Sequence, residues 1–222
     1  ADVTFADGAD IITASAGTSN FRAGVNAGNS IASGGNYNTV VGDEAGTAIT
    51  TGVRNVLLGY AAGDSLTDAD YNVAVGYDSL AIDTLGSKAV ALGYAALSTQ
   101  NFTSATDNFN TAVGFAAGSS VSTGINNTLI GGLAGDALTD ADSNVAIGYN
   151  SMSSSVLGSQ SVAVGSGALF SMNPASAVNM LNTAVGYDAG NAITTGTDNT
   201  IVGGLAGDAS TTGAGNTFIG KE

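Results

Sequence analysis

A short apolar segment that ends in glycine recurs throughout the chain. The eleven glycines stand at Gly42, Gly59, Gly76, Gly93, Gly114, Gly131, Gly148, Gly165, Gly186, Gly203 and Gly220. The step from one glycine to the next is 17 in the numbering, except after Gly93 and Gly165, where it is 21. Three steps of the shorter kind and one of the longer kind make a larger 72-residue unit, which separates Gly42 from Gly114 and Gly114 from Gly186. A regular repeat of this length predicts a repeat architecture.

A 17-residue period is too short for a strand, a crossover helix and a second strand. It suits two short strands and two turns, so the pattern predicts an all-β fold, a parallel β-solenoid whose coils stack about 4.8 Å apart. Gly24 stands one slightly longer step before Gly42, which indicates a degenerate twelfth coil. We therefore expect an N-terminal entry strand or cap over residues 1–19 and a solenoid of about twelve coils over 20–222. Its length is on the order of 55 Å.

The strands are apolar at three successive positions before each glycine. The residue before the glycine is Val, Leu or Ile, and two places earlier it is Thr or Val, so these two share a face that we assign to the core of the coil. The residue between them points the other way and is also apolar. A strand that is apolar on both faces is usually buried on both, which predicts an oligomer. The expected interface residues are Leu57, Ala74, Ala91, Ala112, Leu129, Ala146, Ala163, Ala184 and Ile201.

Asparagine recurs at the start of most strands, and stacked coils would place these side chains in an amide ladder. The positions are Asn38, Asn55, Asn72, Asn110, Asn127, Asn144, Asn182, Asn199 and Asn216. An amide neither accepts nor donates a proton near neutral pH, so this row does not indicate catalysis.

Composition argues against several functional classes. The chain has no Cys and no His, which removes disulfides, thiol nucleophiles and catalytic triads that need histidine. Four basic residues against eighteen acidic ones give a net charge of −14, which excludes a track for nucleic-acid phosphates. No apolar run is long enough to predict a transmembrane helix. We expect neither enzymatic activity nor a cofactor.

Four strand segments carry a family resemblance. NVAVGY (72–77), AVALGY (89–94), NVAIGY (144–149) and SVAVGS (161–166) resemble the head repeats of YadA-type trimeric autotransporter adhesins. That resemblance extends over about 38–220 and implies a left-handed β-roll, a homotrimer around a threefold axis and an extracellular location on a bacterial cell surface. The coils here are longer than those of the adhesin heads. Their Ala-Gly and Thr-Thr-Gly turns also resemble repeats in the fibres of tailed phages, which implies a virion tail fibre instead.

Two acidic turns have the same sequence, Leu-Thr-Asp-Ala-Asp, at 66–70 and 138–142. Carboxylates in a turn are candidate Ca²⁺ ligands, and the candidates here are Asp64, Asp68, Asp70, Asp136, Asp140 and Asp142. The third 72-residue unit replaces the motif with Ser210–Ala214, which favours solvated turns over a metal site. The same carboxylates as a glycosidase pair lack basic or aromatic cleft residues.

An aromatic residue follows the strand glycine in six coils. These residues are Tyr60, Tyr77, Tyr94, Phe115, Tyr149 and Tyr187. We expect the rings to stack from coil to coil or at a subunit interface. The alternative is a platform that binds sugars.

Each 21-residue coil contains an insertion, at 98–109 and at 170–181. Loops that interrupt a solenoid are frequent binding sites, but these two contain large apolar residues that need cover. A neighbouring chain could cover them, or they could contact a receptor. The residues concerned are Phe102, Phe109, Phe170, Met172, Pro174 and Met180.

These features favour a non-enzymatic fibre or adhesin segment, a rigid homotrimeric rod that attaches to a host or a surface through a glycan or protein receptor. One alternative is a self-polymerising extracellular filament or matrix protein. Another is a module that binds ice or carbohydrate through a row of threonines.

Overall fold

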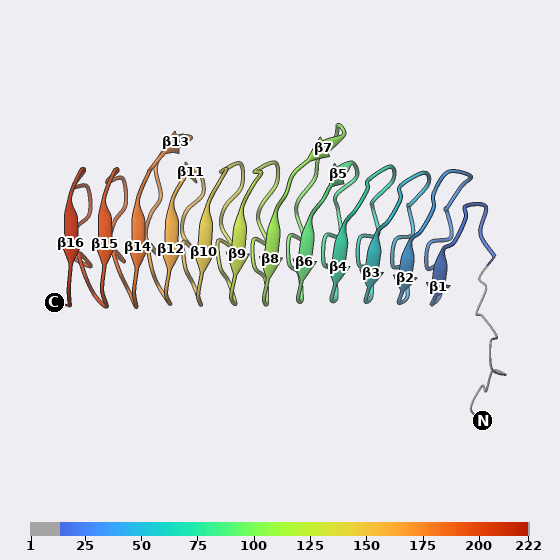
Figure 1. Cartoon of the computed structure of the whole chain (residues 1–222), viewed down its shortest axis with the longest axis horizontal. Coiled ribbons are helices and arrows are strands. Elements are labelled where there is room, and N and C mark those ends of the chain that lie inside the picture. The colour runs from blue at the N-terminus through green and yellow to red at the C-terminus, as the bar shows by residue number, and fades with distance from the viewer. Residues whose placement is uncertain (1–13, 222) are drawn as a thin grey trace, which may run out of the picture.

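The computed structural model describes residues 14–221 and shows a rod built from β-strands, with no helix in that range (Figure 1). Most strands have three residues, because the glycine corner ends each one. The strands are β1 Phe21–Ala23, β2 Thr39–Val41, β3 Val56–Leu58, β4 Val73–Val75, β5 Gly86–Ser87, β6 Val90–Leu92, β7 Thr106–Asp107, β8 Thr111–Val113, β9 Thr128–Ile130, β10 Val145–Ile147, β11 Gly158–Ser159, β12 Val162–Val164, β13 Val178–Asn179, β14 Thr183–Val185, β15 Thr200–Val202 and β16 Thr217–Ile219.

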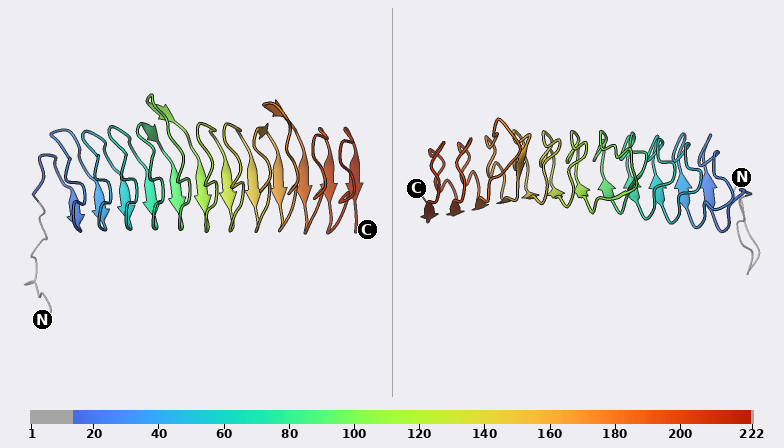
Figure 2. Two further views of the ribbon diagram at one scale, coloured as in Figure 1. Left: turned by 180° about the vertical axis from the view of Figure 1, so that it is seen from behind. Right: turned by 90° about the horizontal axis from the view of Figure 1, so that it is seen from above.

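Twelve of these strands form one parallel sheet in the order β1-β2-β3-β4-β6-β8-β9-β10-β12-β14-β15-β16. Equivalent positions of neighbouring coils are paired, so Val56 lies beside Val73 and Val73 beside Val90. The sheet follows one side of the rod and the turns make up the other (Figure 2). The predicted β-solenoid is confirmed, and the degenerate twelfth coil is confirmed by the pairing of Phe21 with Thr39.

The two 21-residue coils leave the regular path at the same edge of the rod. Their extra residues form β7 and β13, which pair in parallel with β5 and β11 of the preceding coils. Figure 1 shows β7 and β13 standing above the neighbouring turns. The insertions are therefore short strand-bearing loops.

The first coil differs from the others at its centre. Arg22 occupies the middle strand position, where its guanidinium donates hydrogen bonds to the backbone oxygens of Gly28 at 2.7 Å and Ala14 at 2.6 Å. Residues 14–19 contain no strand and precede this coil. The remainder of the expected entry strand or cap over 1–19 lies outside the described residues.

The structure reverses our assignment of the two strand faces. The middle residue of each strand from β2 to β15 in the main sheet lies in the core, and those residues expected at an oligomer interface are fully buried within a single chain. They pack against turn residues such as Ile49, Leu66 and Leu138. The prediction that they contact another subunit was wrong, because no second chain can reach them. The corrected residues are Leu57, Ala74, Ala91, Ala112, Leu129, Ala146, Ala163, Ala184 and Ile201.

The reason for this reversal is the narrowness of the coil. A strand of three residues presents either one or two side chains inward, and only one fits between the sheet and the packed turn residues. Alanine at the middle position leaves room for a leucine or isoleucine from the turn. The sequence carried one usable signal: threonine occurs repeatedly at the first strand position, whereas polar residues do not occur at the middle position between Val40 and Phe218.

The asparagine ladder is confirmed inside the rod. Asn127 illustrates its pattern: its Oδ1 accepts a hydrogen bond from the Asn144 backbone N–H at 3.0 Å, and its Nδ2 donates to the Ala141 oxygen at 2.8 Å. Each amide thus connects its own turn to the next coil. Ala89 and Ser161 interrupt the column, and both stand in the coil before an insertion. After Ala89, the Asn108 side chain supplies the missing oxygen and accepts from the Asn110 N–H at 2.9 Å.

Candidate interaction surface

The outward side of the main sheet is an uncharged surface that follows the rod. We call it the outer strand face and define it by the first and third residues of each strand from β2 to β16 of the main sheet. All of these side chains are partly or fully exposed, including Leu58 at 46% and Leu92 at 42%. The face consists of Thr39, Val41, Val56, Leu58, Val73, Val75, Val90, Leu92, Thr111, Val113, Thr128, Ile130, Val145, Ile147, Val162, Val164, Thr183, Val185, Thr200, Val202, Thr217 and Ile219.

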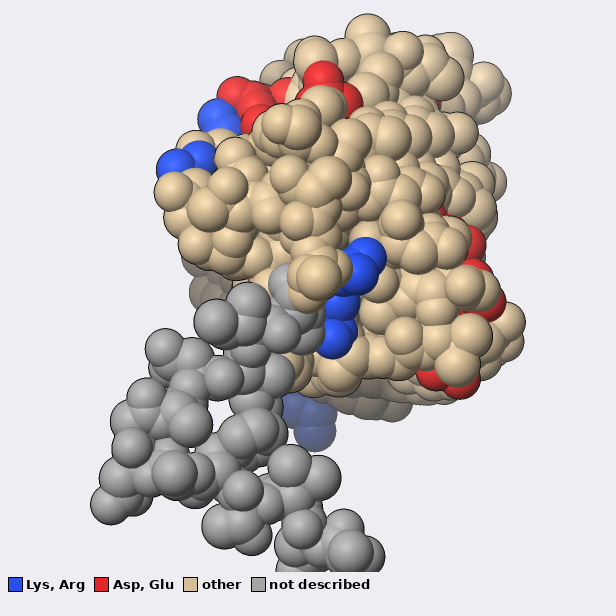
Figure 3. Space-filling view, turned by 90° about the vertical axis from the view of Figure 1, so that its right-hand side faces the viewer, with Lys and Arg blue, Asp and Glu red and all other residues tan. Residues whose placement is uncertain are grey.

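Charge is sparse over the visible surface at the N-terminal end of the rod. Figure 3 shows acidic side chains near the upper and right margins of that view and basic side chains at its left margin and near its centre, with uncharged residues between them. The outer strand face contains no charged residue although the chain carries a net charge of −14. Two copies of this face can therefore approach without bringing like charges together.

The tyrosine ladder comprises the aromatic residues that follow the strand glycines. Its first part is one continuous stack: ring centroids lie 5.1 Å apart for Tyr60 and Tyr77, 5.4 Å for Tyr77 and Tyr94, and 5.0 Å for Tyr94 and Phe115. The expected stacking from coil to coil is confirmed there. Because inner rings of the stack cover one another, they present their edges to solvent. A sugar-binding platform made from ring faces is therefore ruled out for the inner rings, Tyr77 and Tyr94.

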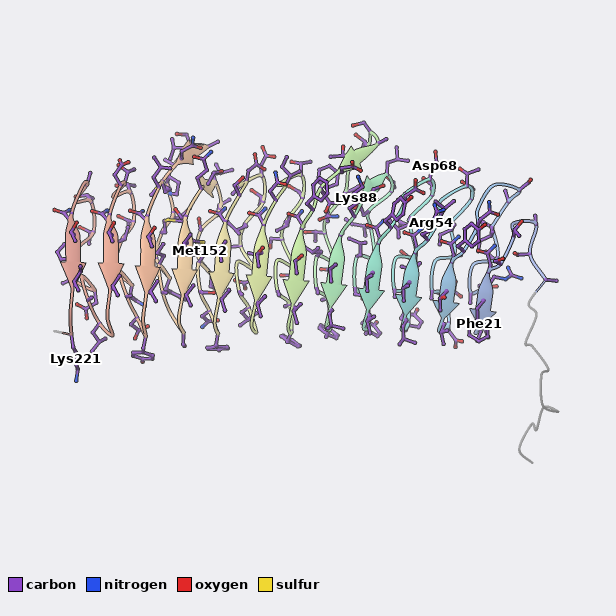
Figure 4. The ribbon with its side chains drawn as sticks, viewed as in Figure 1. Phe21, Arg54, Asp68, Lys88, Met152 and Lys221 are labelled. Atoms are coloured by element: carbon purple, nitrogen blue, oxygen red, sulfur yellow. The ribbon has the colours of Figure 1, made fainter. Side chains whose placement is uncertain are left out.

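A second row, in which aromatic and basic residues alternate, was not identified from the sequence; it occupies the position one residue before the asparagine column in five successive coils, from Tyr37 to Phe109. The Arg54 guanidinium carbon lies 5.2 Å from the Tyr37 ring centroid and 5.3 Å from that of Tyr71, and the Lys88 ammonium lies 5.1 Å from the Phe109 centroid. Figure 4 places Arg54 and Lys88 on the edge opposite Lys221, which occupies the position of the tyrosine ladder in its coil. Such cation–π contacts stabilise exposed rings by about 0.5–1 kcal/mol each. The alternation of basic and aromatic residues at this position of successive coils was the available signal.

The acidic turns place four of the six candidate carboxylates against donors of the preceding coil. Asp70 accepts a hydrogen bond from the Val53 N–H at 2.7 Å, and Asp142 accepts from the Ile125 N–H at 2.7 Å. Asp68 and Asp140 accept from threonine hydroxyls. Asp64 and Asp136 accept from serine hydroxyls. Over residues 14–221, no group of three or more acidic side chains is arranged to hold a metal ion.

The insertions cover their own apolar residues. Met172 and Met180 are fully buried, Phe102 is 6% exposed and Pro174 is buried, all within one chain. Burial inside the chain means that these residues need no neighbouring subunit and are not receptor contacts, so both interpretations were wrong for them. Phe109 is the exception at 54% exposed, and it lies beside Lys88. Phe170 is half-buried and lines a small cleft.

A buried carboxylate anchors the first insertion. Asp83 is fully buried, and its Oδ1 accepts hydrogen bonds from the backbone N–H groups of Gly86 at 3.1 Å and Phe102 at 3.0 Å. Its Oδ2 accepts from Gln100 Nε2 at 2.6 Å, while Gln100 Oε1 accepts from Asn110 at 2.8 Å. No cation pairs with this carboxylate in the described part of the chain. Burial raises the pKa of Asp83, and these hydrogen bonds oppose that rise.

The second insertion replaces this polar cluster with an apolar one. Ser155, Met172 and Met180 stand 72 residues after Asp83, Gln100 and Asn108, at the equivalent positions of the next unit. The two methionines fill the space beside Gly158. The Ser155 hydroxyl is buried and makes no hydrogen bond. The two 72-residue units thus support equivalent loops by different chemistry, which provides a matched internal control.

We expect the buried Asp83 to make the stability of the rod depend on pH. The pKa of Asp83 is higher in the folded state than its ordinary value of 3.8, so the fold favours the protonated carboxyl. The stability that this group contributes is therefore fully present below pH 3.8 and is lost as the pH rises through the folded-state pKa. The variant Asp83→Ser with Gln100→Met and Asn108→Met copies the second insertion. The free energy of unfolding of wild type minus that of this variant should fall as pH rises. Urea titrations across the acid range measure it, and a difference that does not vary with pH would contradict the expectation.

Comparison of the chain with protein-family models, with curated proteins and with solved structures found no match. The described residues also contain no helix that is long and apolar enough to cross a membrane. The surfaces of the rod therefore carry the evidence for its function.

Proposed function

We propose that the chain is a non-enzymatic fibre segment, a rigid rod that associates with two further copies through its outer strand face and serves attachment to a host or a surface. The observation that carries this proposal is the uncharged, partly exposed outer strand face, which follows the rod from β2 to β16. The trimer and the role in attachment are the ones implied by the sequence resemblance.

The dimensions of the outer strand face support self-association. Eleven strands at about 4.8 Å spacing and three residues at about 3.3 Å give a strip of roughly 50 by 10 Å, or about 500 Å² on each chain. Three chains that turn this face toward a common axis would together bury about 1,500 Å², an area in the range of standard-size interfaces. Every copy has the same distance between coils, so side-chain ridges and grooves remain in register along the whole strip.

Association through this face can be tested by adding charge to it. Sedimentation velocity should give the mass of a trimer for the wild-type chain, and Leu92→Glu with Ile130→Glu should shift it to a monomer, because two buried like charges cost several kcal/mol at an interface. Thr50→Glu with Thr211→Glu adds the same charge on exposed turn positions and should leave the trimer intact. A monomeric wild type would overturn the proposal, and a mass that grows with concentration would favour the filament.

A further inference from the structure

The tyrosine ladder changes character after Phe115. Gly132, Ser166 and Gly204 occupy ring positions in alternate coils, so Tyr149 and Tyr187 stand without an aromatic neighbour on the adjoining coils. Within the described residues, no ring stacks on either of them. They are 59% and 61% exposed, more than the 48% of Tyr77 inside the continuous stack. These two tyrosines therefore keep ring faces available to a ligand.

A small cleft lies where the ladder lacks a ring at Ser166. Its volume is about 260 Å³, and it is lined by Tyr149, Asn150, Ser166, Gly167, Phe170, Tyr187, Asp188 and Asn191. The coils on either side are in register, because Gly167 N–H donates to the Tyr149 oxygen at 3.0 Å and Asp188 N–H to the Ser166 oxygen at 2.9 Å. The cleft is smaller than drug-sized sites of roughly 300–1,000 Å³. Its size suits one six-membered ring.

Polar groups are held in fixed positions in this cleft. Asn191 Nδ2 donates to the Gly167 oxygen at 3.2 Å and to Asp188 Oδ1 at 3.1 Å. The carboxylate of Asp188 lies directly over Gly167, where an added Cβ would be 1.9 Å from its Oδ1. Asn150 Oδ1 is buried and makes no hydrogen bond within the chain. The cleft thus combines aromatic surface with amide and carboxylate groups that accept hydrogen bonds from hydroxyls.

We propose that this cleft binds a single neutral sugar ring, which fills the missing ring position of the ladder at Ser166. The apolar face of the sugar packs on Tyr149 or Tyr187, and its hydroxyls bond to Asp188 and the neighbouring amides. Asp188 disfavours acidic sugars, because its carboxylate would repel theirs. This inference deepens the proposed attachment role by naming its ligand class, and the outer strand face remains free to form the trimer.

The test uses saturation-transfer NMR on the full chain with glucose, galactose and N-acetylglucosamine as probes, beside glucuronic acid and p-cresol. At least one neutral sugar should bind, with glucuronic acid binding at least tenfold more weakly. Ser166→Tyr completes the aromatic stack and should weaken sugar binding at least tenfold, while Ser104→Tyr, an exposed loop position, should not change it. Asn191→Ala should weaken sugar binding several-fold without loss of fold.

Three results would overturn the sugar site. The first is that no neutral sugar binds. The second is that p-cresol alone binds, which would indicate that the occupant is an aromatic side chain of a partner. The third is that Ser166→Tyr leaves sugar binding unchanged. Sedimentation of the same samples keeps this outcome separate from the trimer: a trimer that binds no sugar contradicts the site alone, and a monomer that binds sugar contradicts the trimer alone.

Discussion

Replacement of Gly114 by alanine is expected to lower the free energy of unfolding by roughly 3 kcal/mol or more. Gly114 has φ of +140°, a backbone conformation that residues with a Cβ rarely adopt, and an added Cβ would lie 2.5 Å from the backbone oxygen of Gly131. The atoms nearest to that Cβ all belong to the backbone of the next coil, so the strain cannot be relieved by a change of rotamer. The measurement is urea unfolding monitored by far-ultraviolet circular dichroism.

Gly204→Ala is the matched control for this substitution. The nearest atom to its added Cβ is the Tyr187 oxygen at 3.9 Å, and no left-handed conformation is required there. The control should change stability by no more than about 0.5 kcal/mol, as expected for a surface site. Equal effects of the two substitutions would mean that close packing of successive corners does not explain the glycine at this position.

Asn127→Ala is expected to destabilise the rod by roughly 2–4 kcal/mol. The substitution leaves the Asn144 N–H and the Ala141 oxygen without their partners in a buried column, and each unsatisfied backbone group costs about 1–3 kcal/mol. The loss occurs at the centre of the sheet, so coils on both sides lose a neighbour. Urea unfolding measures the change.

Asn173→Ala provides the comparison for the amide column. Asn173 is exposed in the second insertion, and its replacement should change stability by no more than about 0.5 kcal/mol. Ala89 already occupies the column in the native chain, where Asn108 supplies the oxygen that Asn110 needs. If Asn127→Ala were as harmless as the exposed control, the ladder would not contribute to stability through its hydrogen bonds.

The architecture could be predicted because each coil repeats the same local chemistry. Glycine after the strand, asparagine before it and a constant step between most coils determine where strands pair, and parallel stacking in register follows from that identity. Stacking of Tyr60, Tyr77, Tyr94 and Phe115 follows for the same reason, since equivalent residues of successive coils lie about 4.8 Å apart.

The direction of the strand faces could not be predicted from the alternation alone. Both faces are apolar. The alternation of side chains along a strand predicts that Leu57 and Leu58 point to opposite sides, but it does not predict which of the two lies in the core. Closure of the coil decided this, because the turn carries Leu66 into the interior and leaves room there for one strand residue. The buried polar cluster at Asp83 has a similar origin: the 21-residue coil folds over the coil before it and brings Gln100 to Asp83, while Asn110 donates to Gln100.

The sequence by itself thus determined the repeat, the parallel stacking, the amide column and the continuous aromatic stack, because these depend on identical residues at a fixed step. The tertiary structure alone decided which strand face is exposed, how each insertion covers its apolar residues, and that a cleft opens where Ser166 interrupts the ladder. These features depend on the width of the closed coil and on contacts between different columns. No single column of the repeat contains that information.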